Sequence, residues 1–143
     1  MKIVIDTNCL LRTLPKKSEY RCLWDAFVYG KFELCYTTEI LNEYEEVLSY
    51  CYSREAAKMV TDTILGIPNT NPITVFYKWL LITADPDDDK FVDCAISANA
   101  NFIVTNDKHF NVLKNMAFPK ANVIDIDTFK NMIESPRSAI EKI

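Results

Sequence analysis

The chain has 143 residues, of which 49% are apolar and 25% charged, a composition typical of a globular protein that can bury its own core. No segment reaches the roughly 18 apolar residues of a membrane span. The formal net charge of −4 counts against a dedicated nucleic-acid-binding protein, which is more often basic, but does not exclude one whose acids gather at a single site.

The cysteines and glycines exclude further classes of protein. The five cysteines have no CxxC spacing, their number is odd, and His109 is the sole histidine, so neither a zinc site nor a full set of disulfides is expected. Gly30 and Gly66 are the only glycines, which excludes the glycine-rich phosphate loops of nucleotide-binding folds. The first residues form an apolar strand-like run rather than a leader peptide. We therefore expect a cytoplasmic protein with reduced thiols, no membrane association and one domain over residues 1–143.

Predicted strands and helices alternate along the chain. In chain order the pattern predicts a strand at Lys2–Asp6, a helix at Cys22–Tyr29, a strand at Leu34–Thr37, helices at Thr38–Cys51 and Arg54–Leu65, a turn-rich break at Asn69–Pro72, an apolar segment at Val75–Thr83 that fits either class, a helix from Asp85 to about Asn99, a strand at Phe102–Thr105, a short helix at Lys108–Asn115, a strand at Asn122–Ile126 and a last helix at Thr128–Ile133. This alternation predicts an α/β fold with a central parallel sheet of about four to five strands and helices on both faces.

Acidic residues follow two of the predicted strands and begin one of the helices. Asp6 ends the first strand, Asp107 comes just after the strand at Phe102–Thr105, and Asp85–Asp89 carries four acids in five residues. The carboxyl ends of parallel strands share one edge of a sheet, so these acids are expected to lie close together. Carboxylates gathered without Lys or Arg repel one another, and hard cations such as Mg²⁺ or Mn²⁺ relieve that repulsion. The sequence therefore predicts a metal site.

Each of these acids also has an ordinary structural interpretation. Asp6 and Asp107 can cap the backbone of the segment that follows them. Acids in Asp85–Asp89 can complement the dipole of a helix N-terminus, although four of them exceed that need. Asp93 lies nearly opposite the apolar face of its helix and is expected to be solvated, and His109 is expected to be a surface or helix-start residue.

Helix geometry leaves two choices open. Glu43 and Glu45 flank the apolar face of the helix at 38–51 on opposite sides, so either can turn toward the sheet edge. Asp88 and Asp89 likewise flank the apolar face of the helix that begins at residue 85.

In four segments the chain resembles the PIN-domain ribonucleases, in particular the toxin-like PIN proteins of prokaryotes. The matching segments are Ile3–Asn8, Leu41–Leu48, Asp85–Phe91 and Ile103–Asp107, and together they span most of the chain. Each motif is weak alone, but four in the family's order and spacing are specific. The resemblance selects Glu43 over Glu45 and places the third acid at Asp88, with Asp89 as the alternative.

The resemblance implies a single PIN-like, Rossmann-like domain that hydrolyses RNA by metal-activated water. It implies that one or two Mg²⁺ or Mn²⁺ ions are held by Asp6, Glu43, Asp88, Asp107 and, in the alternative, Asp89, supported by Thr7, Asn8, Thr105 and Asn106. Asn106 is a mild departure, since Gly or Arg is common there in the family. Such proteins are often toxins of toxin–antitoxin pairs, so the implied partners are RNA, an antitoxin protein and a second copy of the chain.

Two other functions fit parts of the pattern. Receiver and haloacid-dehalogenase folds also place Asp at strand ends, but the second needs an Asp where this chain has Asn8, and the first needs paired acids where it has Thr7 and Asn8. A non-catalytic PIN-like module that binds protein or RNA without cutting is the other alternative. The RNA target and the number of metal ions are not readable from the sequence, because specificity depends on surface loops and pocket shape.

Overall fold

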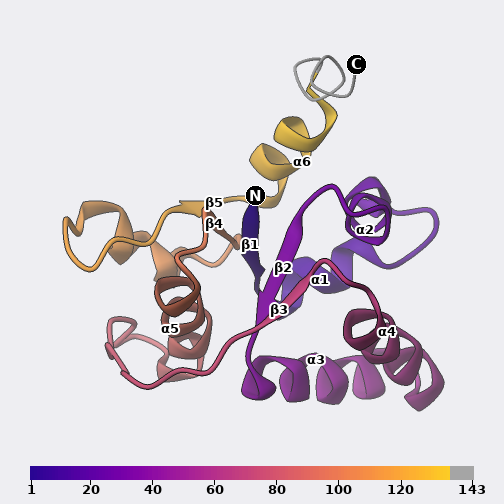
Figure 1. The fold of residues 1–143 in the computed structure, drawn as a ribbon, viewed down its shortest axis with the longest axis horizontal. Coiled ribbons are helices and arrows are strands. Elements are labelled where there is room, and N and C mark those ends of the chain that lie inside the picture. The colour runs from indigo at the N-terminus through magenta and orange to yellow at the C-terminus, as the bar shows by residue number, and fades with distance from the viewer. Residues whose placement is uncertain (136–143) are drawn as a thin grey trace.

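The computed structural model describes residues 1–135, which fold around one five-stranded parallel sheet (Figure 1). The strands are β1 (Lys2–Ile5), β2 (Glu33–Tyr36), β3 (Thr70–Pro72), β4 (Phe102–Val104) and β5 (Val123–Ile124), and their order across the sheet is β3-β2-β1-β4-β5. β1 is the central strand and pairs with β2 on one side and β4 on the other. The predicted α/β class and parallel sheet are confirmed.

Helices cover both faces of this sheet. They are α1 (Thr7–Thr13), α2 (Arg21–Val28), α3 (Thr38–Cys51), α4 (Arg54–Gly66), the 3₁₀ turn η1 (Pro86–Asp88), α5 (Asp89–Ala98), the 3₁₀ segment η2 (Lys108–Asn115) and α6 (Ile126–Glu134). Figure 1 shows α5 on one side of the sheet, α2 and α4 on the other, and α3 across the end where β1 and β2 finish. The helices predicted on both faces are confirmed.

Side-chain caps explain where several helices begin. Thr37, Ser53 and Asp125 each accept a hydrogen bond from a backbone N–H in the first turn of α3, α4 and α6. A cap of this kind contributes about 1 kcal/mol. α5 ends at Asn99, which adopts the left-handed conformation with φ 52°.

Three local predictions were wrong or incomplete. The turn-rich break at 69–72 contains the edge strand β3, because Thr70 and Asn71 pair with Leu34 and Cys35 of β2 even though the sequence there is rich in turn formers. The short helix α1 was not predicted. The apolar segment Val75–Thr83 is neither helix nor strand. It buries Ile82 while Phe76 and Leu80 stay exposed, so it has no single periodicity.

α3 buries its apolar face in the core, and a polar flank of this helix lies at the edge of the sheet. Ile40, Tyr44 and Leu48 of α3 are fully buried, as the helical spacing predicts. The Tyr44 hydroxyl donates a hydrogen bond to the carbonyl of Ile5, the last residue of β1. This contact fixes α3 next to the residue where β1 ends, so Glu43 comes beside the segment that starts at Asp6.

Within residues 1–135, no helix is long and apolar enough to cross a membrane. The predicted domain boundary at 143 extends eight residues beyond the described part and stays a prediction. Among the cysteines, Cys9, Cys35 and Cys94 are buried, Cys22 is partly buried and Cys51 is exposed.

Candidate metal and nuclease site

Asp6 lies at the carboxyl end of β1 and is held by two hydrogen bonds. Its Oδ1 accepts the backbone N–H of Cys9 at 2.8 Å, which caps α1, and its Oδ2 accepts the hydroxyl of Thr105. The side chain is 6% exposed. Burial raises the pKa of the carboxyl, the two hydrogen bonds lower it in part, and the charge of Asp107 raises it. Asp6 is therefore both the structural cap foreseen from the sequence and a buried acid at the sheet edge.

Asp107 follows β4, the strand next to β1, and lies close enough to repel the other acids. The backbone N–H of Asp107 donates to the Thr105 hydroxyl at 3.0 Å, so one threonine connects it to Asp6. Its Oδ1 accepts the N–H of His109 at 2.9 Å and caps η2. The expected meeting of acids at neighbouring strand ends is what the structure shows.

Asp88 is the most perturbed acid of the group. It ends η1 just before α5 begins, and its side chain is 17% exposed. Burial, then the charges of Asp107 and Asp85, raises its pKa from 3.8 to about 7. Its Oδ2 is buried and has no hydrogen-bond partner among residues 1–135.

Glu43 reaches the same region from α3. Its Oε2 accepts the hydroxyl of Thr7, the residue after Asp6, and its Oε1 lies 2.8 Å from the Nζ of Lys90. Lys90 is nearly buried and also donates to the Asp87 carbonyl at 2.6 Å. Glu45, the choice that helix geometry left open, is exposed. Thr7 therefore supports Glu43, in line with its predicted supporting position.

Asp89 points to a different part of the molecule. Its Oδ1 accepts the backbone N–H of Ile82 at 2.8 Å, and its side chain is buried. One turn later, Asp93 accepts the N–H of Trp79 at 3.1 Å. The expectation that Asp93 is solvated was wrong, because the segment at 74–84 covers that side of α5. The structure does not bring Asp89 to the other acids, whereas Asp88 lies near Asp107 and Asp85.

The two predicted supporting asparagines differ in their surroundings. Asn106 Oδ1 accepts the N–H of Ile126 at 3.0 Å, which connects the turn after β4 to the start of α6. Asn8 is exposed on α1. Asn106 thus supports the fold around Asp107 rather than a carboxylate directly.

Asp85 and His109 join the site without having been predicted as members. Ligand atoms of Asp85, Asp88 and His109 all lie within 4.8 Å of one another. His109 Nδ1 is 3.6 Å from Asp88 Oδ2 and 3.4 Å from Asp107 Oδ1. The available signal was the position of His109, two residues after a strand-end acid, which puts it in the first turn beside that acid. Its helix-start position was predicted correctly, but its contact with Asp88 depends on the tertiary fold.

The donor set fits a hard divalent cation. Asp6, Asp88 and Asp107 supply carboxylate oxygens, the ligands that Mg²⁺ and Mn²⁺ prefer. The unpartnered Asp88 Oδ2 and the raised pKa values of Asp6 and Asp88 show acids that a cation can stabilise. The residues present therefore fit a cation, and the described ligand atoms that lie close enough to share one, within 4.8 Å of one another, belong to Asp85, Asp88 and His109.

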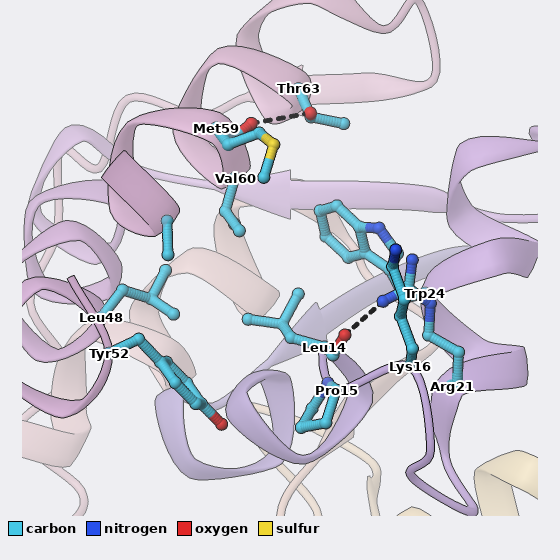
Figure 2. Close-up of a pocket in the computed structure, with 11 residues that line it drawn as sticks. Leu14, Pro15, Lys16, Arg21, Trp24, Leu48, Tyr52, Met59, Val60 and Thr63 are labelled. Carbon is cyan, nitrogen blue, oxygen red and sulfur yellow. Dashed lines mark hydrogen bonds between the residues drawn. The ribbon is translucent and has the colours of Figure 1, made fainter. Parts of the chain in front are cut away.

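A pocket of about 450 Å³ lies apart from these acids, beside α1 to α4. Its lining is mainly apolar, with Leu48 and Val60 on one side and Trp24 on the other (Figure 2). Arg21 at its rim donates a hydrogen bond to the carbonyl of Leu14. None of the acids described above lines it, so it is not part of the site.

Comparisons with known proteins agree on the fold. One solved structure that matches is a chain of VapBC2 from Rickettsia felis, crystallised bound to a DNA fragment from its promoter; it is 18% identical, the match covers 87% of this chain and 98% of that chain, and the TM-score is 0.60. No curated protein matches. The family model described as the PIN domain matches residues 2–109, which include the sheet edge, α3, η1 and Asp107. The chain therefore belongs to the PIN domain family.

Proposed function

We propose that this protein is a divalent-metal-dependent endoribonuclease and the toxin of a toxin–antitoxin pair. The observation that carries the proposal is that Asp107 lies near both Asp6 and Asp88 and raises the pKa of each, while a buried oxygen of Asp88 accepts no hydrogen bond from the described residues. PIN domains are generally nucleases, and this chain has each acid of the pattern that its resemblance implies. The cofactor we propose is Mg²⁺ or Mn²⁺.

The proposed metal ligands are Asp6, Asp88 and Asp107, with Glu43 completing the acid set. A divalent cation bound there supplies Lewis acidity, activating water for attack on a phosphodiester and stabilising the leaving oxygen. The protein contributes a fixed arrangement of carboxylates, because Thr105 and the Cys9 N–H orient Asp6 and the His109 N–H orients Asp107. Such pre-orientation removes the reorganisation that free carboxylates need.

Glu43 and His109 have separate proposed roles. Thr7 and Lys90 hold the two oxygens of Glu43, so the carboxylate is fixed in one orientation. His109 is 44% exposed and lies against Asp88 and Asp107, where its imidazole can exchange a proton with a leaving alkoxide. We propose it as an auxiliary proton donor.

The proposed partners are an RNA substrate and an antitoxin protein, and the proposed location is the cytoplasm. The antitoxin proposal is supported by the likeness in fold to a chain of VapBC2, which was crystallised as a complex with promoter DNA. A homodimer follows from the resemblance alone, and light scattering of the purified chain tests it.

The decisive experiment incubates the purified protein with a labelled mixed-sequence RNA in Mn²⁺, Mg²⁺ or EDTA. Three proteins are compared: the wild type, Asp6→Asn, which keeps a cap-forming side chain, and Asp62→Asn, a matched control at an exposed residue of α4. We expect cleavage by the wild type and Asp62→Asn only with metal, and a loss of at least about 100-fold in Asp6→Asn. Equal cleavage by Asp6→Asn would contradict the proposed mechanism.

The non-catalytic alternative makes a different prediction in the same experiment. An interaction module binds RNA or a protein partner, leaves the RNA intact in every metal, and shows no Mn²⁺ binding by calorimetry. Mn²⁺ binding that Asp88→Asn abolishes, without cleavage of the mixed RNA, points to a selective RNA target instead.

A further inference from the structure

Two loops that adjoin Asp85 and Asp107 in the chain carry exposed aromatic side chains. Phe76 is 93% exposed, Phe118 82% and Tyr77 63%. Trp79 joins them, since its ring packs edge-on against Tyr77 at 4.6 Å and against Phe118 at 5.7 Å between centroids. We call Phe76, Tyr77, Trp79 and Phe118 the aromatic platform.

Each of the two platform segments is continuous in the chain with a residue of the acid site. The segment at 74–84 runs directly into Asp85, and the segment at 108–120 begins directly after Asp107. In Figure 1 both segments lie on the same side of the sheet as α5. A strand of nucleic acid that reaches the acids from this side therefore meets the platform.

The platform segment is held in place by buried charges. Asp93 accepts the N–H of Trp79 and Asp89 accepts the N–H of Ile82, so one face of α5 anchors the segment at two points. Leu80, between these anchors, has φ 55°, a left-handed conformation that is unfavourable for a leucine. Anchoring of this kind presents the aromatic rings in a fixed arrangement, and so lowers the entropy lost when a ligand binds.

The two loops that carry the platform have only positive charges in their own sequence, although the chain as a whole is negative and Asp93 of α5 lies near Lys78. Residues 74–84 and 108–124 contain no Asp or Glu, and they carry the lysines Lys78, Lys108, Lys114 and Lys120. Exposed aromatic rings between lysines match the two needs of a single strand, which are faces on which bases stack and cations for the phosphates. A duplex offers the phosphates but keeps its bases stacked inside.

From this juxtaposition we propose that the aromatic platform is a binding site for unpaired nucleotides, which stack on Phe76 and Phe118 while their phosphates lie near Lys78 and Lys120. The inference rests on the proposed function, since it names the form of RNA that the same site receives. It makes the protein selective for single-stranded RNA by stacking rather than by reading base edges.

The test measures binding in EDTA, so that no cleavage is required. Fluorescence anisotropy is recorded with a fluorescein-labelled ten-nucleotide oligouridine and with a labelled RNA duplex of ten base pairs. The variants are Phe76→Leu, which keeps apolar bulk but has no ring, Phe76→Trp, which keeps a ring, and Tyr50→Ala, a control at an aromatic residue of α3 that is 92% exposed.

We expect Phe76→Leu to bind the oligouridine at least about fivefold more weakly, since stacking on one ring contributes about 1–3 kcal/mol per base. Phe76→Trp and Tyr50→Ala should bind within twofold of the wild type, and the duplex should show no dependence on residue 76. Lys78→Gln should flatten the dependence of oligouridine affinity on salt.

Three results would overturn the platform. The first is that the wild type does not bind oligouridine, and the second is that Phe76→Leu binds it as tightly as the wild type. The third is that Phe76→Leu changes from a dimer to a monomer while its RNA affinity stays the same, because this face would then be an interface between copies. The proposed nuclease function fails separately. RNA binding that depends on the ring, without metal-dependent cleavage, would contradict the nuclease proposal and support the platform. Metal-dependent cleavage without ring-dependent binding would support the nuclease proposal and contradict the platform.

Discussion

In the native state without a metal ion, the Asp88 carboxylate is repelled by the charges of Asp107 and Asp85. Its pKa is raised to about 7 by burial and by Asp107 and Asp85, while the same group in an unfolded chain titrates near 3.8. The native state therefore binds more protons between these values, and this group's contribution to the free energy of unfolding falls as pH rises through that window. Above about pH 7 the ionised carboxylate is a net cost to folding unless a cation binds.

This gives a prediction for Asp88→Asn. In EDTA at pH 8 the variant should melt at a higher temperature than the wild type, by about 3 °C for each kcal/mol of relieved repulsion. The difference should shrink toward pH 4, where the wild-type carboxyl is protonated. Thermal denaturation followed by circular dichroism at both pH values checks it, and a variant less stable than the wild type at pH 8 contradicts it.

Thr105 gives a second prediction at the same scale. Its hydroxyl donates to Asp6 and so lowers the pKa of that carboxyl. In Thr105→Val the pKa of Asp6 should rise further, and protons should compete with the cation up to a higher pH. The acidic limb of Mn²⁺ binding, measured by calorimetry from pH 5 to 8, should move to higher pH. An unchanged limb would show that Asp6 does not titrate in competition with the metal.

The residue-scale predictions from sequence succeeded where chain position alone decides the location. Asp6 and Asp107 follow strands that prove to be neighbours, so their meeting follows from β–α alternation. Asp93 was mispredicted, because its partner is a backbone N–H of an irregular segment whose path no periodicity reveals. The contact of His109 with Asp88 joins residues from different elements, and a single sequence carries no record of it.

At the scale of elements, the acids of α5 and of the turn before it have two separate tasks. Its N-terminus places Asp88 in the site, and Asp89 and Asp93 hold the segment at 74–84. The sequence predicted this helix but not the division of its acids. Asp88 and Asp89 both flank the apolar face by spacing, and the packing of residues 79–82 against Asp89 separates the two in the structure.

Asp93→Ala tests the anchoring role of α5. The substitution leaves the Trp79 N–H without its acceptor, so that amide should exchange with deuterium at least about fivefold faster, since a lost hydrogen bond of this kind costs about 1 kcal/mol or more. Asp93→Asn keeps an acceptor oxygen and should stay close to the wild type. Hydrogen exchange followed by mass spectrometry, on peptides that cover 74–84, separates the two. Equal protection in all three proteins would show that the anchor does not hold the segment.

At the scale of the whole molecule, metal binding and folding should be coupled. The acids come from the end of β1 at Asp6, from η1 and from the turn after β4, which are assembled only in the folded chain. A cation at 100 times its dissociation constant should therefore add about 2.7 kcal/mol to the free energy of unfolding. Differential scanning calorimetry with and without Mn²⁺ should show a rise in Tm that Asp88→Asn lacks and Asp62→Asn keeps. A rise of equal size in Asp88→Asn would place the cation elsewhere.

Both edges of the sheet are poorly suited to pairing with a further strand. Ile73 donates its N–H inward to the Tyr36 carbonyl, so the residue before it, Pro72, faces outward, where proline removes the donor that an added strand would need. The opposite edge, β5, is only two residues long. Edges of this kind resist edge-to-edge aggregation of copies. We therefore expect any assembly of copies to use helices or loops, whose contacts can be weakened by surface substitutions without harming the sheet.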